Sequence, residues 1–274
     1  MERPTWAPQG IDLSVPSVSR IYDYYLGGSY NFEADREAGR RAIEAFPGLP
    51  KVMQANRAFM RRAVRHAIGE GVNQFLDIGS GIPTFGNVHE IARAADPAAR
   101  VVYVDHDPVA VAHSRAVLDG EEQAAIVSAD LRAPHEILGS PEAGRLLDLD
   151  RPVALLLVAV LHFMEDKDDP WKAVARLRDA LAPGSLLVLT HASLEGGPRK
   201  PEEGEGVQDV YRKAGAPLLM RSREDVARFF DGFEILDPGL VSMPYWRPDA
   251  ADTPEGSDED PVVFSGFAGV GRKQ

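Results

Sequence analysis

Apolar residues along the chain follow two different periods. From residue 17 to about 70 they recur at helical spacing, which predicts helices at 17–25, 33–45 and 50–68. From residue 73 onward, short apolar runs alternate with helical segments. The expected strands lie at 74–78, 100–104, 124–128, 153–158 and 185–190, and the helices between them at 87–95, 107–118, 134–147 and 170–181. This alternation predicts an α/β three-layer sandwich around a mostly parallel sheet.

The last part of the chain is less regular. Residues 195–206 are rich in Gly, Pro and Glu and predict a mobile loop. Two short helices follow near 207–213 and 222–230, and two strands near 233–241 and 262–270. At the other end, three prolines within residues 1–16 predict an extended arm rather than a helix or strand.

A glycine turn and a later acidic residue are the features that indicate a bound ligand. The run FLDIGSGIPT at 75–84 is an apolar strand that ends in a turn, and VVYVD at 101–105 is an apolar strand that ends in an acid. This is the pattern of the first half of a nucleotide-binding βαβ unit. The turn lets a ligand approach bare backbone, and the Asp105 carboxylate can bind a ribose diol.

The details of the turn argue against a dinucleotide. Thr84 stands where the third glycine of the G-x-G-x-x-G pattern is expected, and Pro83 removes an N–H that a phosphate would use. Asp77 places a carboxylate just before the loop, which would repel a pyrophosphate but suits a cation. A ligand with a ribose, a positive charge and no phosphate fits better, and S-adenosylmethionine (SAM) is such a ligand.

Several segments resemble known proteins. FLDIGSG, VVYVDHDP and AIVSAD resemble motifs I, II and III of class I SAM-dependent methyltransferases. SRIYDYYLGGSYNF and the ending FAGVGRK resemble an actinobacterial family of SAM-dependent methyltransferases with unassigned substrate, from Ser19 to Lys273. The resemblance implies a Rossmann-like, seven-stranded sheet in the order 3-2-1-4-5-7-6 with the last strand antiparallel. It suggests an N-terminal arm and helical lid at 1–70 and a SAM-binding domain at 71–274.

Ligands of open α/β sheets bind beyond the carboxyl ends of the strands, so we expect the cofactor residues around one crevice. Asp105 would bind the ribose and Asp77 the methionine ammonium. By resemblance to motif III, Asp130 and Leu131 would bind the adenine. The candidate cofactor-binding residues are Tyr22, Gly27, Gly28, Arg57, Asp77, Gly79, Gly81, Asp105, His106, Asp130, Leu131 and Ala159.

Alternatives stay open for some of these. The tyrosines around Gly27-Gly28 could cover the cofactor as a lid, since aromatic faces attract a sulfonium, or could simply pack a core. Arg57 could bind the cofactor carboxylate or form a surface salt bridge. Asp107 could also face the ligand, but its place before Pro108 favours a capping role at the start of a helix.

In-line methyl transfer needs a base only when the acceptor is a hydroxyl or an ammonium. His162, after the fourth predicted strand, is the first candidate base, and His191, after the fifth, is the second. The histidines show no ligand spacing such as H-E-x-x-H, so no metal site is expected.

Composition narrows the class of protein. The net charge of −12 disfavours non-specific nucleic-acid binding, and the absence of cysteine excludes disulfides. No apolar leader and no run of 18 apolar residues is present, which predicts a cytoplasmic protein without membrane contact. The acidic stretch at 249–260 is expected to be a solvated loop, or else a docking site for a basic partner. Nothing in the sequence indicates the oligomeric state.

The sequence therefore predicts a SAM-dependent methyltransferase that acts on a small-molecule acceptor by in-line transfer. One alternative is a SAM-binding sensor or scaffold without catalytic activity. The other, less favoured by the glycine spacing, is an NAD(P)-dependent oxidoreductase.

Overall fold

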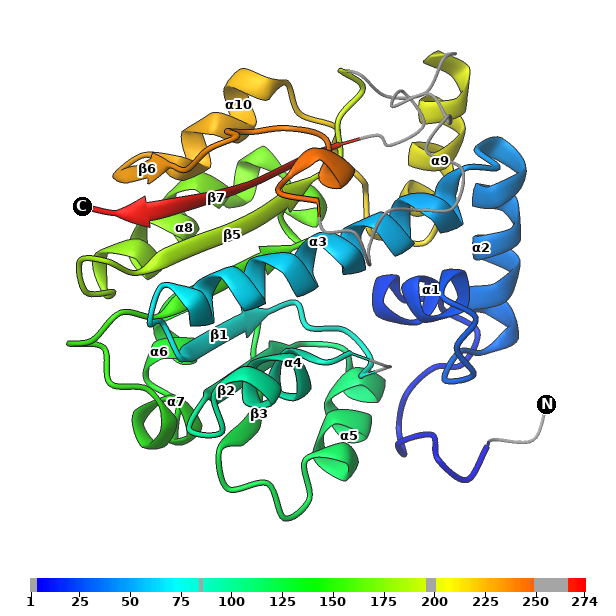
Figure 1. Cartoon of the computed structure of the whole chain (residues 1–274). Helices are drawn as coiled ribbons and strands as arrows, with labels where there is room; N and C mark the ends of the chain where they lie inside the picture. The colour runs from blue at the N-terminus through cyan, green and yellow to red at the C-terminus, as the bar shows by residue number, and fades with distance from the viewer. Residues whose placement is uncertain (1–3, 84–85, 196–200, 249–265) are drawn as a thin grey trace.

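A computed structural model of the chain describes residues 4–83, 86–195, 201–248 and 266–274. Within them, seven strands form one sheet in the order β3-β2-β1-β4-β5-β7-β6 (Figure 1). The strands are β1 (Gln74–Ile78), β2 (Arg100–Asp105), β3 (Ala124–Ser128), β4 (Ala154–Val158), β5 (Leu186–His191), β6 (Phe233–Ile235) and β7 (Phe267–Lys273). All neighbours are parallel except those of β7. The predicted strand order and the antiparallel last strand are confirmed.

Three helices cover one face of the sheet. They are α3 (Leu49–Gly69), which runs across the sheet in Figure 1, α4 (Val88–Ala95) and α5 (Pro108–Val117). Strand side chains such as Phe75 and Leu156 pack on this side with Phe59 of α3. Because neighbouring residues of a strand point to opposite faces, Leu76 and Leu155 lie on the other side.

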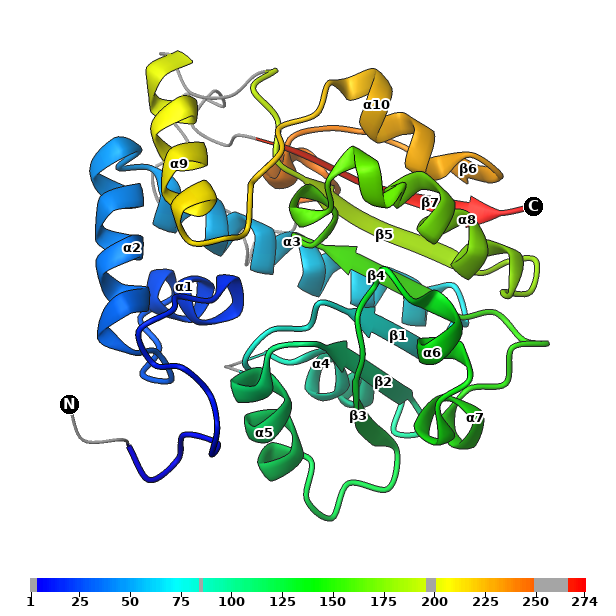
Figure 2. The same ribbon diagram turned by 180° about the vertical axis from the view of Figure 1, so that it is seen from behind.

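That second face is covered by α6 (Pro134–Leu138), α7 (Pro141–Leu146), α8 (Pro170–Asp179) and α10 (Arg223–Ala227), seen from behind in Figure 2. Short 3₁₀ turns occur at Leu161–Phe163, Asp166–Asp168, Arg228–Phe230 and Met243–Tyr245. The apolar strands are buried on both faces, which confirms the three-layer α/β sandwich.

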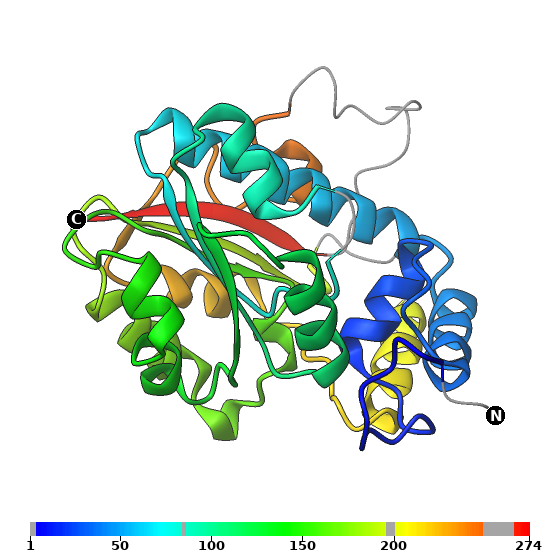
Figure 3. The same cartoon turned by 90° about the horizontal axis from the view of Figure 1, so that it is seen from below.

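The remaining helices form a cap beyond the carboxyl ends of the parallel strands. The cap consists of α1 (Val18–Tyr25), α2 (Glu33–Ala45) and α9 (Pro201–Lys213), which gather at one end of the molecule in Figure 3. Tyr25, Ala42, Val207 and Tyr211 from these helices share one core with the α3 face of the sheet. Segments about 170 residues apart thus fold together.

Helix α9 corrects the sequence prediction of a loop over 195–206. Two glycines in its first half face close neighbours. A Cβ on Gly204 would lie 2.5 Å from a methyl of Leu194, and one on Gly206 would lie 2.8 Å from the Cβ of Ala45 in α2. These glycines allow close packing of α9 rather than flexibility. Residues 196–200 of the same stretch lie outside the described residues.

Two smaller differences have local causes. The helix expected at 134–147 is split into α6 and α7, since Ser140 caps α7 by accepting a hydrogen bond from the Ala143 N–H at 3.2 Å and Pro141 opens it. β6 is shorter than expected because a turn follows it, closed by the Gly239 N–H to the Leu236 carbonyl at 2.8 Å. The start of the predicted last strand, 262–265, and the acidic stretch 249–260 lie outside the described residues.

The described part of the arm, residues 4–16, forms neither helix nor strand, as predicted. It packs Ala7 into a small core with Phe32, Ile82 and Val109, and Trp6 stacks on Phe32 with ring centroids 5.0 Å apart. The arm thereby joins the cap to α5 and to the turn after β1. None of the described helices has both the length and the apolar character needed to cross a membrane.

Candidate active site

A cleft opens at the carboxyl ends of β1, β2 and β4 and consists of two cavities that meet at Gly79. The first, which we call the Asp77 half, holds about 500 Å³, and the second, the Asp105 half, about 370 Å³. Ten of the twelve predicted cofactor residues line one or both: Tyr22, Arg57, Asp77, Gly79, Gly81 and Ala159 in the Asp77 half, and Gly79, Asp105, His106, Asp130 and Leu131 in the Asp105 half.

The glycine turn after β1 forms the floor between the two halves. Gly79 and Gly81 have φ angles of +75° and +69°, which side chains other than glycine adopt only with strain. A Cβ on Gly79 would lie 2.6 Å from Cγ2 of Val160, which follows β4. The backbone at this point is therefore bare because both its conformation and its neighbour require it.

Asp105 ends β2 with its carboxylate held in place. Oδ2 accepts a hydrogen bond from the Gly81 N–H at 2.7 Å, and Oδ1 accepts one from the Asp107 N–H at 2.8 Å. Burial raises the pKa of this carboxyl, and the two hydrogen bonds oppose that rise. Because each carboxylate oxygen can accept two hydrogen bonds, one position on each oxygen is left for a ligand.

Asp77 and Arg57 bring opposite charges to the other half of the cleft. Asp77 is buried in β1, and burial raises its pKa to about 7, while the charge of Arg57 acts in the opposite direction. The guanidinium of Arg57 also donates to the Gly86 carbonyl at 3.1 Å. A carboxylate and a guanidinium lining one cavity complement the ammonium and the carboxylate of an amino acid.

Asp130 borders the Asp105 half, but its carboxylate is also bonded to Arg132. One oxygen accepts from the Arg132 backbone N–H at 2.8 Å and the other pairs with its guanidinium at 2.7 Å. Arg132 pairs in turn with Asp168 at 3.1 Å. Leu131 is buried beside the cavity, whereas His106 is exposed at its rim.

Arg20 and Asp107, which the sequence did not assign to the site, anchor α1 beside the cleft. Asp107 caps α5, as predicted, by accepting hydrogen bonds from the Val109 and Ala110 N–H groups. Its second carboxylate oxygen accepts from the Ser17 hydroxyl and lies 3.6 Å from the Arg20 guanidinium, which also pairs with Asp35 of α2 at 3.4 Å. Buried charges joined in this way fix the position of α1.

A larger, apolar cavity of about 750 Å³ lies between the cap, α3 and the ends of β4 and β5. We call it the apolar cavity. Its wall includes Phe46, Leu49, Val52, Met53, Phe163, Val207, Tyr211, Leu218, Met220 and Met243. Among the residues that the structure describes, no charged side chain lines it. Its polar side chains are those of Tyr22, Asn56, His162, Thr190, His191 and Tyr211, and the Tyr211 hydroxyl donates to that of Tyr25 at 3.3 Å.

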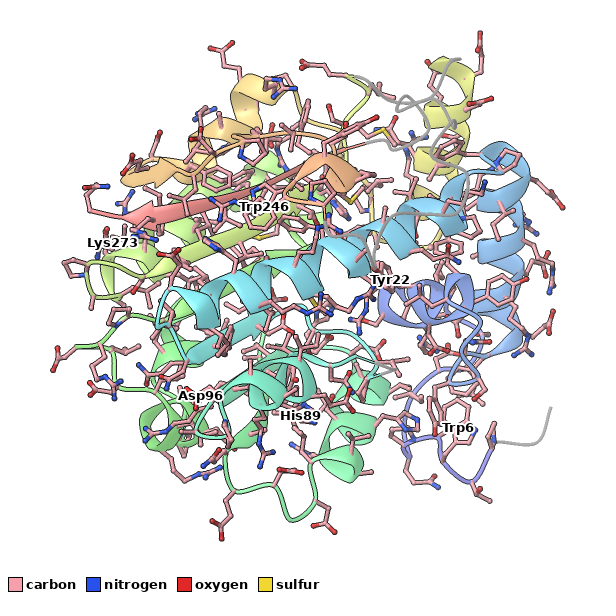
Figure 4. The ribbon with its side chains drawn as sticks, in the orientation of Figure 1. Trp6, Tyr22, His89, Asp96, Trp246 and Lys273 are labelled. Atoms are coloured by element: carbon pink, nitrogen blue, oxygen red, sulfur yellow. The ribbon has the colours of Figure 1, made fainter. Side chains whose placement is uncertain are left out.

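A chain of hydrogen bonds runs along the border between this cavity and the Asp77 half. The Ala159 N–H donates to Thr190 Oγ1 at 2.8 Å, and the Thr190 hydroxyl donates to Asn56 Oδ1 at 2.8 Å. Asn56 Nδ2 then donates to the Tyr22 hydroxyl oxygen at 2.9 Å. These bonds hold Tyr22 of α1, labelled in Figure 4, against α3.

Sequence reasoning missed Asn56 and Thr190. A signal for Asn56 was present: the buried face of the predicted helix at 50–68 includes Val52 and Phe59, and Asn56 falls four residues after Val52 on that face. A polar side chain on a buried helix face needs a hydrogen-bond partner. Nothing in the sequence pointed to Thr190.

Comparison with known proteins shows the family. A protein-family model described as S-adenosyl methyltransferase matches residues 4–274. The chain belongs to the S-adenosyl methyltransferase family. Its methyl donor is SAM, so the dinucleotide alternative is set aside.

Two solved structures are similar over nearly the whole of this methyltransferase. One is a DUF574 family protein from Streptomyces avermitilis, with 40% identity over 96% of this chain and 99% of that chain and a TM-score of 0.90. The other comes from Thermobifida fusca, a protein for which methyltransferase activity has been suggested, with 39% identity over 99% and 100% of the two chains and a TM-score of 0.90. Among curated proteins, none matches this chain.

The cleft of this methyltransferase offers groups that fit SAM. Asp105 has two carboxylate oxygens that match the spacing of a ribose diol, Asp77 and Arg57 bring opposite charges to one cavity as the head group of an amino acid would need, and the bare backbone at Gly79 joins the two halves. Gly27 and Gly28 line neither half. Gly27 has a φ of +77° in the turn that ends α1, and a Cβ on Gly28 would lie 2.0 Å from Asp23 Oδ1. The turn itself accounts for both glycines.

The two candidate bases of the methyltransferase both line the apolar cavity and are both engaged in hydrogen bonds. His191 contacts the Ala192 carbonyl through Nδ1 at 2.7 Å and the Arg221 guanidinium through Nε2 at 2.9 Å. His162 Nδ1 accepts from the Ala192 N–H at 3.3 Å. Burial lowers the pKa of His191 to about 4 and that of His162 well below its ordinary value. Both imidazoles are therefore neutral at pH 7.

Proposed function

We propose that this protein transfers a methyl group from SAM to a small, apolar molecule bound in the apolar cavity. One observation carries the proposal. The apolar cavity and the Asp77 half of the cleft share wall residues, namely Val18, Tyr22, Asn56 and Ala159. A molecule in the apolar cavity would therefore adjoin the cofactor cleft across a border made by Tyr22 and Ala159.

In this proposal, Asp105 binds the ribose of SAM, and Asp77 and Arg57 bind its amino-acid head group. His106, Asp130 and Leu131 border the adenine, while the backbone at Gly79 and Gly81 passes beneath the ligand. When bound, SAM supplies a methyl group activated by the positive charge on sulfur. Tyr22 lines both cavities, and its ring would favour a cation at the border, because aromatic faces attract cations.

The protein would contribute mainly position and exclusion of water. In-line transfer depends on holding two reactants in line, and the hydrogen-bond chain from Ala159 to Tyr22 fixes the border where they would meet. His162 would orient the acceptor rather than remove a proton from it, because its Nδ1 is already engaged and burial lowers its pKa, which makes the ring a weak base. His191, with both ring nitrogens bonded, would support His162.

We also propose that the N-terminal region acts as a lid, with α9 as a second part. Within residues 1–70, α1 and α2 belong to the cap. α3 has two roles, because Val52 and Asn56 line the apolar cavity while Phe59 packs on the sheet. The predicted division near residue 70 would then separate two parts that share α3 as a common wall.

An acceptor screen tests the proposal. The protein is incubated with methyl-labelled SAM and panels of apolar small molecules, peptides and nucleic acids. We expect label only in small molecules, and loss of this transfer in Leu218→Trp, which fills the apolar cavity at a residue that lines neither half of the cleft. SAM affinity should be unchanged in that variant. Label in macromolecules alone would contradict the proposal, and tight SAM binding without any transfer would favour the sensor or scaffold.

A further inference from the structure

We infer that the acceptor is an uncharged molecule with a hydrogen-bond acceptor atom, which binds the Nε2–H of His162, and that His191 and Arg221 are positioning residues for this donor. This inference rests on the proposed function, because it takes the apolar cavity as the acceptor site. It adds the chemical feature by which the cavity recognises its ligand.

The guanidinium of Arg221 is held in place by several hydrogen bonds. Its side chain is buried, and its nitrogens donate to the Leu161 carbonyl at 3.1 Å, to the Met164 carbonyl at 2.8 Å and to Asp166 Oδ1 at 2.6 Å. The guanidinium carbon lies 5.1 Å from the ring centre of Trp171. With so many partners the guanidinium has one position.

Arg221 decides where His191 carries its proton. A guanidinium only donates hydrogen bonds, so His191 Nε2, 2.9 Å from Arg221, must accept. The proton of the neutral ring is then on Nδ1, which donates to the Ala192 carbonyl at 2.7 Å. Both nitrogens of His191 are used, and the ring is a support rather than a ligand contact.

Ala192 also determines which ring nitrogen of His162 carries the proton. The Ala192 N–H can only donate, so His162 Nδ1, at 3.3 Å, accepts and the proton of the neutral ring lies on Nε2. The two imidazoles meet edge to face with centroids 5.5 Å apart. Within the described part of the chain, Nε2 has no hydrogen-bond partner, while His162 lines the apolar cavity and is 9% exposed.

The chemistry of the ligand follows from this donor. This N–H has no partner among the described residues, so a ligand oxygen or nitrogen with a lone pair would accept its hydrogen bond in place of solvent. A charged ligand would find no opposite charge, since no charged side chain of the described residues lines the cavity. Burial, with His191 and Arg221, also lowers the pKa of His162, so the ring stays neutral.

Two probes of nearly equal shape test the inference in protein loaded with S-adenosylhomocysteine. Quinoline has a ring nitrogen that accepts a hydrogen bond, and naphthalene has none. The measured quantity is the ratio of their dissociation constants. In His162→Phe we expect the dissociation constant of quinoline to rise about five- to tenfold relative to that of naphthalene. In His162→Gln, which keeps an N–H donor, the ratio should stay near the wild-type value. His135→Phe, on the exposed surface of α6, should leave it unchanged.

Nitrogen NMR of the histidine rings gives a second readout that a purely structural role would not predict. In the wild type we expect His162 in the Nε2–H form and His191 in the Nδ1–H form, both uncharged from pH 8 down to pH 5.5. In Arg221→Met, His191 should lose its single form. The ratio of the quinoline to the naphthalene dissociation constant should then rise toward that of His162→Phe.

The outcomes separate this inference from the function beneath it. If S-adenosylhomocysteine does not bind the wild type, both fall. If it binds but His162→Phe leaves the ratio unchanged, or neither probe binds, the recognition by His162 is wrong while the methyltransferase site stands. A His162 ring that is charged at pH 7 or protonated on Nδ1 would also overturn it.

Discussion

The carboxylate of Asp105 holds the glycine turn through a 2.7 Å hydrogen bond from the Gly81 N–H. The acid that ends β2 therefore has a structural partner in the turn that follows β1, besides the ligand it is proposed to bind. Asp105 is only 3% exposed, so its replacement affects the fold as well as the site. An Asp105→Ala variant would leave two backbone N–H groups without their partner.

Asp105→Asn keeps the shape but removes the charge and one of the two acceptor oxygens. We expect S-adenosylhomocysteine binding to weaken by about 1.5–3 kcal/mol, as for a lost hydrogen bond to a charged group. Calorimetry measures this. The control is Asp96→Asn, an acid that also accepts from a backbone N–H but lies after α4, outside the cleft lining. Equal affinities in the two variants would show that Asp105 serves the turn alone.

Asp77→Asn should stabilise the ligand-free protein at alkaline pH. Burial raises the pKa of Asp77 to about 7 from 3.8, so the folded state holds the proton more tightly than the unfolded state between these values. The free energy of unfolding should therefore fall as pH rises through this window, by up to about 1.4 kcal/mol per pH unit. Urea unfolding from pH 4.5 to 8 should show a smaller fall in the variant.

Asp77→Asn should also weaken the binding of SAM, because the ammonium of SAM would lose its proposed partner. In the wild type, affinity should rise with pH up to about 7 as Asp77 ionises. A variant that binds SAM as well as the wild type, with the same pH profile, would remove Asp77 from the cofactor site.

Ala159→Gly should raise the free energy of unfolding by about 1 kcal/mol. Ala159 has a φ of +57°, where an L-residue is strained and glycine is not. Ala125→Gly in β3 is the control, since its backbone is extended and glycine there should destabilise the protein. If both substitutions lower the free energy of unfolding to the same degree, the backbone conformation of Ala159 does not reduce the stability of the protein.

Gly206→Ala should destabilise the cap, because the added methyl group would lie 2.8 Å from the Cβ of Ala45, which cannot turn away. Gly204→Ala should cost less, since the methyl it would meet at 2.5 Å ends the exposed side chain of Leu194. Gly144→Ala in α7 has nothing within 4 Å and should instead stabilise by about 0.5–1 kcal/mol. Thermal unfolding and amide exchange in α2 and α9 would measure the difference. Equal stabilisation by Gly206→Ala and Gly144→Ala would mean that α9 does not depend on close packing.

Much of the architecture could be predicted because it depends on local patterns. The apolar runs of β1 to β5 and the glycine turn at Gly79 are visible in the sequence. The order of the strands did not follow from these patterns but from the family resemblance, and it is that of the structure. The helix at α9 was missed since Gly204 and Gly206 look like loop residues. These glycines pack against Ala45, which is far away in the chain, and against Leu194, which precedes the helix. No local sequence pattern reveals these contacts.

The site shows the same limit. The positions of His162 and His191 after β4 and at the end of β5 were predictable from the strands. Their hydrogen bonds were not, because these depend on Arg221, which comes from a later segment. Similarly, Thr190 gains its role from Asn56, 134 residues earlier in the chain. Such partners can be identified only once the fold has brought them together.

The proposed SAM site and the apolar acceptor site share the border at Tyr22 and Ala159. A crystal structure with S-adenosylhomocysteine would test this arrangement. We expect the ribose hydroxyls on the Asp105 carboxylate, the amino-acid group at Asp77 and Arg57, and the sulfur facing the apolar cavity across that border. A ligand whose sulfur points away from the apolar cavity, or one bound elsewhere than in the cleft, would contradict it.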